Sequence, residues 1–334
     1  MIWKRGRRRA GHSTSVRYLA MKVPLRGHAH PSATLCITAI AVVAWALATS
    51  VAAGEEPTTK YVMSFDRPGA VGNRYKFTCS YKLKQKATFG GPEKREPWNR
   101  VLIANCEGIR ATLATDKNGK STKISLAIDQ FTYQFDDGPK QTIPQGATIT
   151  SELKDGKTVF AMNGADVPED VHDFLRQFLL PGANLVSADE RFGTKLPRAV
   201  GEEWPMNASA TAAGFAAAGS HVDEKNIVGT VKLGGVSEVE GVECFKIESE
   251  YRATNVTEKA TKADRSELVS GFHERAVVML PRDESRTRLR FSLVKERTSQ
   301  WTWKPKDGSA IPVTETSLLE FDQHSVPVEE AKKR

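Results

Sequence analysis

The dominant pattern along this chain is an alternation of apolar and polar residues. Between Arg74 and Lys84 every second side chain is apolar, and the residues between them are charged or hydroxylated. Successive side chains of a β-strand point to opposite faces, so this segment is predicted to be a strand with one buried and one wet face. Its 11 residues would span roughly 35 Å at about 3.3 Å each. Such a length suits a broad antiparallel sheet better than a compact sandwich.

Further segments with the same period are separated by short turns. Asn118-Gly119 and Asp155-Gly156 supply the positive φ angles that tight hairpins favour, and Gly234-Gly235, Glu240-Gly241 and Asp307-Gly308 mark other breaks. Strands joined in this way are antiparallel neighbours. The expected strands are residues 74–84, 109–115, 122–128, 131–135, 149–153, 158–162, 227–233, 242–251, 297–303 and 311–321.

One pair of these segments changes parity. The apolar residues of 124–128 fall on even positions, whereas those of 131–135 fall on odd positions. Because one extra residue restores a common face, this change predicts a β-bulge or a break near Asp129 and Gln130.

Helical periodicity is clear in one segment. Apolar residues spaced by three and four from Val171 to Leu179 form one stripe of a helix predicted at 167–180. Asp166 is expected to cap its start, and Pro181-Gly182 to end it. The alanine-rich segment 208–219 fits either a second helix or a small-residue loop.

The predicted fold class is therefore mainly β (α+β), with an antiparallel sheet and one or two packed helices. Residues 54–182, including the helix, form the N-terminal half of the β domain. Residues 183–334 form its C-terminal half and end in a short charged tail, 329–334. The segment 182–203 is the best candidate for the boundary.

The formal net charge of +8 comes from the start of the chain. Residues 1–53 contain eight of the 48 Lys and Arg residues and none of the 40 Asp and Glu residues, so 40 basic and 40 acidic residues remain in 54–334. A formally neutral body argues against a basic nucleic-acid-binding surface. No nucleic-acid partner is expected.

This leader has the three parts of a secretory signal peptide: a basic region, an apolar run at 35–53 and small residues before a polar start. Cleavage is predicted after Ala53, and a start at Met21 would make residues 1–20 an extension. The alternative is an uncleaved anchor, because 19 mostly apolar residues just reach across a bilayer. The protein is expected in the periplasm or cell envelope, with the leader, if uncleaved, as its link to the membrane.

Export would place the cysteines in an oxidising compartment, where a disulfide can form. In an oxidising compartment Cys79 and Cys106 can pair as a disulfide and leave Cys244 unpaired. Alternatively, all three are small buried apolar residues. The sequence leaves both alternatives open.

A weak family resemblance lies in the C-terminal half. The segment Lys195–Trp204, followed by small residues, Gly229–Leu233 and Glu240–Ile247, resembles a diffuse group of exported bacterial proteins of unknown function, frequent in planctomycetes. That group is similar to the periplasmic lipoprotein-carrier fold, which implies a curved antiparallel half-barrel with helices on its concave side. The match covers about 60 residues and departs at Glu203, where Thr or Ser is usual. It brings no catalytic residues.

Motifs for catalysis or cofactors are missing from the sequence. It contains no Gly-x-Ser-x-Gly, no Gly-x-Gly-x-x-Gly and no His-Glu-x-x-His. We therefore assign no catalytic residue, no cofactor and no metal, and we favour a protein that is not an enzyme without settling the question.

Two groups of residues remain as binding candidates. Arg286, Arg288 and Arg290 alternate with other residues, which predicts three cations on one strand face. They bind an anionic partner or a lipid headgroup in one interpretation and pair with cross-strand acids in the other. Trp301 and Trp303 share a face and line a ligand cavity in one interpretation or fill the sheet core in the other.

These observations lead to one main hypothesis and two alternatives. The main hypothesis is a non-catalytic exported envelope protein whose curved sheet binds an apolar ligand, such as a lipid or acyl chain, or a protein partner. The alternatives are an envelope hydrolase with a site assembled from distant residues and a purely structural assembly protein.

Overall fold

The computed structural model describes residues 59–67, 69–91, 96–182, 186–258, 266–304 and 309–328. All of them belong to one unit, residues 55–334. The predicted leader with its cleavage point after Ala53, the turn at 306–308 and the charged tail 329–334 lie outside the described residues.

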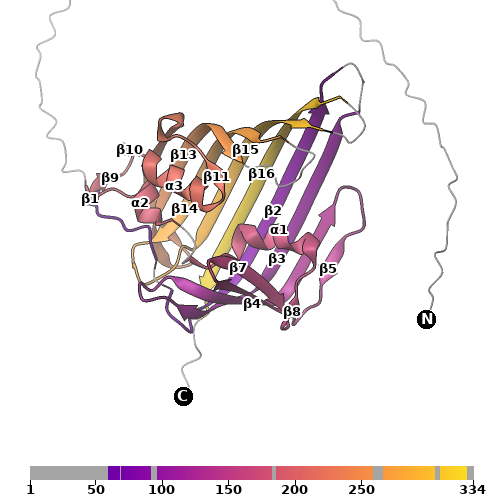
Figure 1. Cartoon of the computed structure of the whole chain (residues 1–334). Coiled ribbons are helices and arrows are strands. Elements are labelled where there is room, and N and C mark those ends of the chain that lie inside the picture. Colours follow the sequence, from indigo (N-terminus) through magenta and orange to yellow (C-terminus); the bar gives the residue numbers. More distant parts are fainter. Residues whose placement is uncertain are drawn as a thin grey trace, which may run out of the picture. The chain divides into compact units, whose positions relative to one another are not determined.

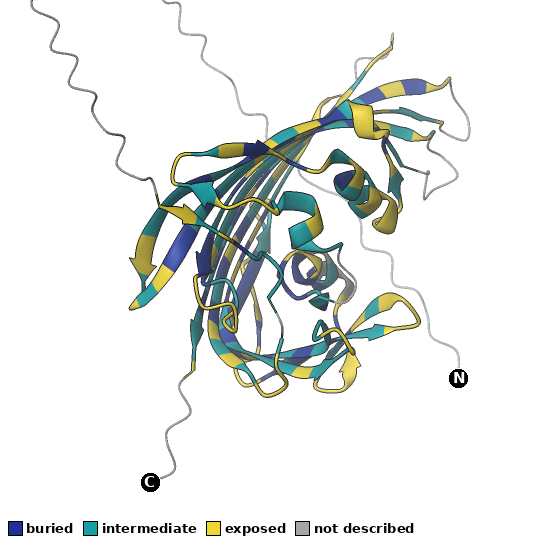
Figure 2. Ribbon diagram, turned by 90° about the vertical axis from the view of Figure 1, so that its left-hand side faces the viewer, coloured by how far each residue is buried: buried dark blue, intermediate teal, exposed yellow. Residues whose placement is uncertain are grey.

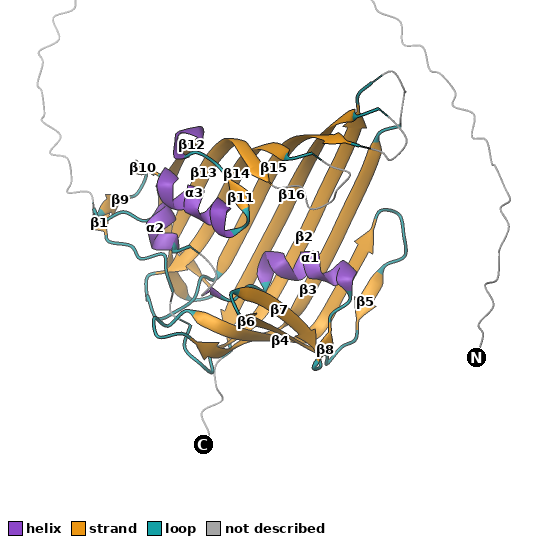
Figure 3. Cartoon of the chain, viewed as in Figure 1, coloured by secondary structure: helices purple, strands orange, loops and turns teal. Residues whose placement is uncertain are grey.

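Long antiparallel strands make up most of the described chain (Figure 3). One 14-stranded sheet has the order β10-β12-β13-β14-β15-β16-β2-β3-β4-β6-β7-β8, with β11 paired to β13 and β5 paired to β4. Its long strands are β2 (Arg74–Phe89), β3 (Trp98–Thr115), β4 (Ser121–Phe135), β12 (Ile227–Val239), β13 (Val242–Glu258), β14 (Leu268–Pro281), β15 (Arg290–Trp303) and β16 (Ile311–Pro327). Its short strands are β5 (Gln141–Ile143), β6 (Thr148–Lys154), β7 (Lys157–Met162), β8 (Ala165–Asp166), β10 (Glu203–Pro205) and β11 (Ser220–His221). A separate two-stranded sheet joins β1 (Lys60–Tyr61) and β9 (Arg198–Ala199).

The first and last long strands meet in the middle of the sheet. β16 pairs antiparallel with β2, from Val313 opposite Phe89 to Pro327 opposite Tyr75. The two predicted halves of the chain therefore share one continuous sheet, joined by a pairing of residues that are far apart in sequence.

The sheet is open and curved, and the helices lie on its concave side (Figures 1 and 2). They are α1 (Glu169–Phe178), α2 (Ala188–Phe192), α3 (Ala208–Ala217) and the short 3₁₀ helix η2 (Glu224–Asn226). This confirms the predicted fold class, a mainly β protein with a curved antiparallel sheet and few packed helices. We call the helix-bearing side of the sheet the inner face and the other side the outer face.

The predicted bulge is present. Glu107 pairs with Gln130 and Gly108 pairs with Ile128, so Asp129 is the extra residue of β4. A Cβ atom at Gly108 would lie 2.1 Å from the Ala127 carbonyl oxygen. Glycine is therefore needed where the bulged strand approaches its neighbour.

Turn residues behave as predicted at two hairpins and differently at a third position. Asp155 and Gly156 have φ angles of 49° and 74°, and Glu240 and Gly241 have 52° and 72°, as a tight type I′ hairpin requires. The expectation of a break at Gly234-Gly235 was wrong. β12 continues through it with a register shift between Leu233 and Gly235, because a bulge also accommodates glycine.

Some element ends differ from the predictions. β3 begins at Trp98, eleven residues before the expected Ile109, and β15 begins at Arg290 rather than Arg297. Asp166 does not cap α1 but belongs to β8, and the N-cap is Pro168, without a side-chain hydrogen bond. Proline disfavours helical geometry in the residue before it, so the helix cannot begin at Val167.

α1 completes the first hydrophobic core. All five residues of its predicted stripe are at most 4 % exposed, namely Val171, Phe174, Leu175, Phe178 and Leu179. The ring of Phe178 stacks on Phe77 of β2 at 5.6 Å, and that of Phe174 meets Tyr81 edge-on at 5.2 Å.

α3 belongs to a second core over β12–β14. Asn207 caps it by accepting a hydrogen bond from the Ala210 N–H at 3.1 Å, and alanine has the highest helix propensity. Of the two alternatives for 208–219, the structure therefore has the helix, at Ala208–Ala217. Thr211 is its buried residue, and Phe215 packs against Phe272 of β14 at 5.5 Å.

The segment Lys195–Trp204 has a structural role beside this core. Trp204 is 3 % exposed, and its Nε1 donates to the Phe192 carbonyl at 2.8 Å. Gly201 has a φ of 88° at the turn before it. Glu202 accepts hydrogen bonds from the Ala199 N–H at 3.0 Å and from Arg198, so these residues fix the approach of Trp204 to the core.

Candidate functional site

An apolar strip runs along the inner face between the two helix-covered cores. α2 and α3 lie over the β12–β14 side and α1 over the β2–β4 side, with β15 and β16 between them (Figure 1). The apolar strip consists of Leu83, Phe291, Leu293, Leu319 and Phe321, which strand register brings together on this face. Leu83, Phe291 and Leu293 are only partly buried, so the strip offers apolar surface that the helices leave accessible.

A polar belt crosses the inner face next to this strip. On β15 and β16 it consists of Lys295, Arg297, Ser299, Glu315 and Ser317. Arg297 donates to Glu258 at 2.8 Å and to Ser299 at 2.8 Å, and Lys295 pairs with Glu274 at 3.4 Å. The two cations of the belt are thus paired with acids of β13 and β14. The belt forms one boundary of the apolar strip.

Trp301 and Trp303 lie beyond the polar belt. Trp301 stands opposite Val313 and Trp303 opposite Ile311, on the inner face as their spacing predicts. The Trp303 ring is 6.4 Å from Phe89. The belt separates the two tryptophans from the apolar strip, so their role in binding a ligand stays a prediction.

A shallow groove of about 930 Å³ crosses the outer face. Its lining residues come from β2, β3, β10 and β12–β16 and include both charged side chains and apolar ones such as Ile103, Val277 and Val294. The charged side chains that line it are Lys82, Glu203, Lys232, Glu248, Glu250, Arg275, Glu320 and Asp322. An open groove with charges of both signs suits a polar partner better than an acyl chain.

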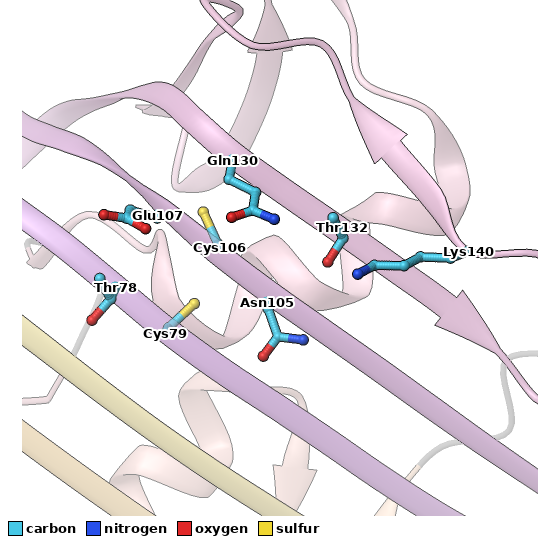
Figure 4. Close-up of a pocket in the computed structure, with 8 residues that line it drawn as sticks. All are labelled: Thr78, Cys79, Asn105, Cys106, Glu107, Gln130, Thr132 and Lys140. Carbon is cyan, nitrogen blue, oxygen red and sulfur yellow. The ribbon is translucent and has the colours of Figure 1, made fainter.

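A smaller pocket of about 310 Å³ lies over β2, β3 and β4 (Figure 4). Its polar lining residues are Thr78, Asn105, Glu107, Gln130, Thr132 and Lys140, which surround the positions of Cys79 and Cys106. Strand alternation places the first five on the outer face, whereas the cysteine side chains belong to the inner core.

Cys79 and Cys106 stand directly opposite each other on β2 and β3. Both thiols are buried and free in the structure, as is that of Cys244. Hydrogen bonding to Cys106 and burial raise the pKa of Cys79 far above its usual range. A thiol with a raised pKa is a poor nucleophile, which does not favour disulfide formation. The directly opposed positions of Cys79 and Cys106 permit the disulfide, which stays a prediction.

The three arginines do not share one strand face, so that prediction was wrong. β15 begins at Arg290, and Arg286 and Arg288 precede it. Arg286 pairs with Asp283 at 3.2 Å and Arg290 pairs with Asp322 at 3.3 Å. Arg288 lies over the inner-face ring of Phe291 at 4.5 Å. Binding of an anionic partner by this group stays a prediction.

The structure adds a residue that the sequence gave no reason to select, Arg110 of β3. It lies on the inner face opposite Tyr75 of β2 and is half-buried. Burial lowers the pKa of Arg288 to about 10, and the positive charge of Arg110 contributes to this shift. The strand pairing agrees with this, although the two arginines are 178 positions apart in the chain. Arg110 stands opposite Tyr75, Tyr75 stands opposite Pro327 of β16, and Ser325 of the same strand donates its N–H to the carbonyl of Leu289, the residue after Arg288.

We next considered the contacts of His273 and the groups of residues that could bind a metal ion. His273, on the outer face, lies 2.7 Å from Glu250 and 3.8 Å from Glu296. Within the described residues it has no hydrogen bond to a serine or cysteine, and no group of three or more His, Cys, Asp or Glu residues could hold a metal ion. In the described part of the chain, no helix is long and apolar enough to cross a membrane.

Comparisons with known proteins return distant similarities. No family model and no curated protein matches the chain. A mutant porin of Rh. blastica shares 9 % identity over 74 % of this chain and 99 % of its own, with a TM-score of 0.18. OpdQ of Pseudomonas aeruginosa shares 7 % over 76 % and 98 %, with a TM-score of 0.18. A DUF1329 family protein from Desulfovibrio piger shares 11 % over 77 % and 88 %, with a TM-score of 0.13. TM-scores this low do not establish a shared fold.

Proposed function

We propose that this chain is an exported, non-catalytic protein of the cell envelope that binds an acyl-chain ligand on the inner face of its sheet. The observation that carries the proposal is the apolar strip of β2, β15 and β16, which borders the first core. Leu319 and Phe321 are buried in that core, whereas Leu83, Phe291 and Leu293 are only partly buried. Apolar surface of this kind gains free energy when an apolar ligand removes it from water, about 25 cal/mol per Å². The leader pattern at 1–53 supports the compartment.

In this proposal the ligand does not lie beneath α1. The helix stripe is fully buried against β2–β4, so the N-terminal core has no room for a ligand beneath the helix. The proposed ligand instead lies over β15 and β16, next to Leu293 and Leu83. This location explains why α1 can be tightly packed in a ligand-binding protein.

A pair of leucine substitutions tests the proposal. Leu293 and Leu318 are both half-buried and lie on neighbouring central strands, Leu293 on the inner face and Leu318 on the outer face. Leu293→Gln is expected to weaken binding of a fluorescent fatty acid by about tenfold or more, because a buried polar group costs 1–3 kcal/mol or more. Leu318→Gln is the matched control and is expected to leave binding unchanged.

Native mass spectrometry of the gently purified protein provides a second measurement. Co-purified lipid that is lost in Leu293→Gln and kept in Leu318→Gln supports the proposal. Absence of both co-purified lipid and probe uptake, or equal loss in the two variants, would rule out the inner-face site.

The outer groove favours a second candidate function, docking of a polar partner chain. Its mixed charges, such as Arg275 opposite Glu250 and Asp322 on β16, suit recognition by complementary charge. The double variant Arg275→Glu, Asp322→Lys reverses two of these charges. If it abolishes capture of a protein by cross-linking in envelope extracts while fatty-acid binding continues, the groove serves a partner and not the acyl ligand.

A further inference from the structure

Arg110 and Arg288 form an arginine pair at the end of the apolar strip that lies away from the polar belt. Arg288 follows Thr287 and precedes β15, and Arg110 lies on β3 opposite Tyr75. The two are linked through Tyr75. Burial raises the pKa of Tyr75, and a hydrogen bond with the Thr287 backbone and the charge of Arg110 partly offset this rise. The pairing of β16 with Tyr75 on one side and with the Leu289 carbonyl on the other, through the Ser325 N–H at 2.7 Å, brings both arginines to the same end of the strip. The arginine pair is therefore a local cluster on one face and not two separate surface cations.

Polar and aromatic contacts hold the Arg288 side chain in place. Arg288 Nη2 donates to Gln323 Oε1 at 3.4 Å, and Gln323 Nε2 donates to Ser325 Oγ at 3.3 Å. Gln323 and Ser325 are each 2 % exposed. The face of Arg288 is held over Phe291 at 4.5 Å, so its guanidinium is positioned beside the first residue of the apolar strip.

The pair lacks a negative counter-charge in the described part of the chain. No carboxylate there lies within ion-pair distance of Arg110 or Arg288, whereas Arg286, Arg290 and Arg297 each have one, at 3.2, 3.3 and 2.8 Å. Burial lowers the pKa of both Arg110 and Arg288, and no acid offsets this effect. Two guanidinium groups that each carry a positive charge and have no ion-pair partner among the described residues suit an oxyanion, which can accept several parallel N–H hydrogen bonds.

We propose that Arg110 and Arg288 bind the oxyanion head group, a carboxylate or phosphate, of an amphipathic ligand whose acyl chain lies along the apolar strip. This inference rests on the proposed function and adds the chemical class of the ligand. The geometry supports it because the cations lie at the end of the strip where Phe291 begins. The chain would then extend over Leu293 and Leu319 toward the polar belt.

Three probes separate the contributions of head group and chain. Oleate carries both an acyl chain and a carboxylate, monoolein carries the same chain with a neutral head, and inorganic phosphate carries an oxyanion without a chain. Binding of each is measured by titration calorimetry and by thermal shift on the full chain and on Arg110→Gln, Arg288→Gln and Arg290→Gln. Arg290 is the matched control, since it lies on the outer face and pairs with Asp322.

We expect oleate to bind more tightly than monoolein. Arg110→Gln and Arg288→Gln are each expected to lower the affinity for oleate by about tenfold and to leave the affinity for monoolein unchanged. Arg290→Gln is expected to change neither. Without ligand, the two inner-face variants are expected to be at least as stable as the parent, because each removes a half-buried cation that has no ion-pair partner in the described part of the chain. This readout distinguishes a binding pair from a structural one, whose loss would lower the melting temperature.

Other outcomes are equally informative. Equal affinity for oleate and monoolein, with no effect of either arginine variant, overturns the arginine-pair site and leaves the acyl function standing. If neither acyl probe binds, the proposed function fails. Stabilisation by phosphate that Arg110→Gln removes would then still support an oxyanion site, and no phosphate effect would overturn it. A loss of apo stability in both inner-face variants without any change in oleate binding also overturns the inference.

Discussion

The two helix-covered parts of the inner face are built in different ways. α1 contributes five buried apolar residues, two of them aromatic, to a core in which rings from β2 and β4 surround Phe174. α3 is composed mainly of alanine, its buried residue is Thr211, and one aromatic ring, Phe215, reaches β14. The second core depends instead on Trp204 and Met206 from the segment before α3.

This difference shows how a single curved sheet combines stability with an accessible surface. The α1 side is closed by large side chains that interdigitate, as protein interiors require. On the other side, the alanine-rich helix α3 packs over β12–β14, and Arg297 pairs with Glu258. These contacts stabilise the strands without covering the whole inner face. The apolar strip lies between the two regions, so rigid packing on one side and lighter coverage on the other leave it available.

The largest expected effect is on the α1 side. Phe174 is fully buried, with ring centroids of Tyr81, Tyr133 and Phe135 within 5.9 Å. Phe174→Ala is expected to lower the free energy of unfolding by about 3–5 kcal/mol, since it leaves a cavity among large rings. The measurement is urea denaturation followed by tryptophan fluorescence. Gln177→Ala on the exposed side of the same helix is the control, and a comparable loss there would show that the cost of Phe174→Ala does not come from packing, since alanine favours the helix at both positions.

The corresponding substitution on the α3 side is expected to cost less. Phe215 is half-buried and packs against Phe272 at 5.5 Å. Phe215→Ala should lower the free energy of unfolding by about 1–2 kcal/mol, because a partly exposed ring loses less apolar contact than a buried one. The ratio of the two losses is the test: equal losses from Phe174→Ala and Phe215→Ala would remove the distinction between the two cores.

How far sequence predicts this architecture depends on the range of the interactions. The strand period of 74–84, the α1 stripe and the extra residue at Asp129 are local patterns, and each appears in the structure where the pattern places it. The first half of β3 was not predicted, because residues 98–108 contain charged and small residues and its pairing with β2 is what makes it a strand.

The candidate site illustrates the same limit. Alternation placed Trp301 and Trp303 on one face, but it could not reveal the polar belt that separates them from the strip. It also grouped Arg288 with Arg286 and Arg290, whereas the fold brings Arg288 close to Arg110 of a different hairpin. A cluster assembled across β2, β3 and β15 depends on the strand order, and the strand order depends on the β16–β2 pairing, which no local motif encodes.

A third prediction concerns the polar network of the α3 side. Ser270 and Ser299 are each 2 % exposed, their hydroxyl oxygens are 3.0 Å apart, and Arg297 donates to both. Ser270→Ala is expected to lower the free energy of unfolding by about 1 kcal/mol, since Arg297 and Ser299 each lose a hydrogen-bond partner. Ser317→Ala on the same face is the control, because Ser317 is half-buried and has less to lose. An unchanged denaturation midpoint for Ser270→Ala would show that this network contributes specificity but no stability.

The smallest expected effect is a pH dependence at the segment that positions Trp204. Hydrogen bonding from the Ala199 N–H, followed by the contact with Arg198, lowers the pKa of Glu202. A carboxylate whose pKa is lower in the folded state stabilises the fold above its ordinary pKa, and this contribution disappears as the pH falls through the lowered value. Glu202→Gln should therefore lower the urea midpoint slightly at pH 7, and the difference from the parent should vanish under acid conditions.

Glu203 provides the matched control for this experiment. It is the next residue, is exposed, and has Lys232 at 3.8 Å as its ion-pair partner, so screening by solvent leaves Glu203→Gln with little effect at any pH. If the gap between the parent and Glu202→Gln stays constant from pH 7 to acid, the side chain acts through packing and not through its charge. In that case the approach of Trp204 to the second core rests on uncharged or charge-independent contacts such as the Gly201 turn, the Trp204–Phe192 hydrogen bond and the pairing of Trp204 with Val231, which would sharpen the contrast with the densely packed α1 side.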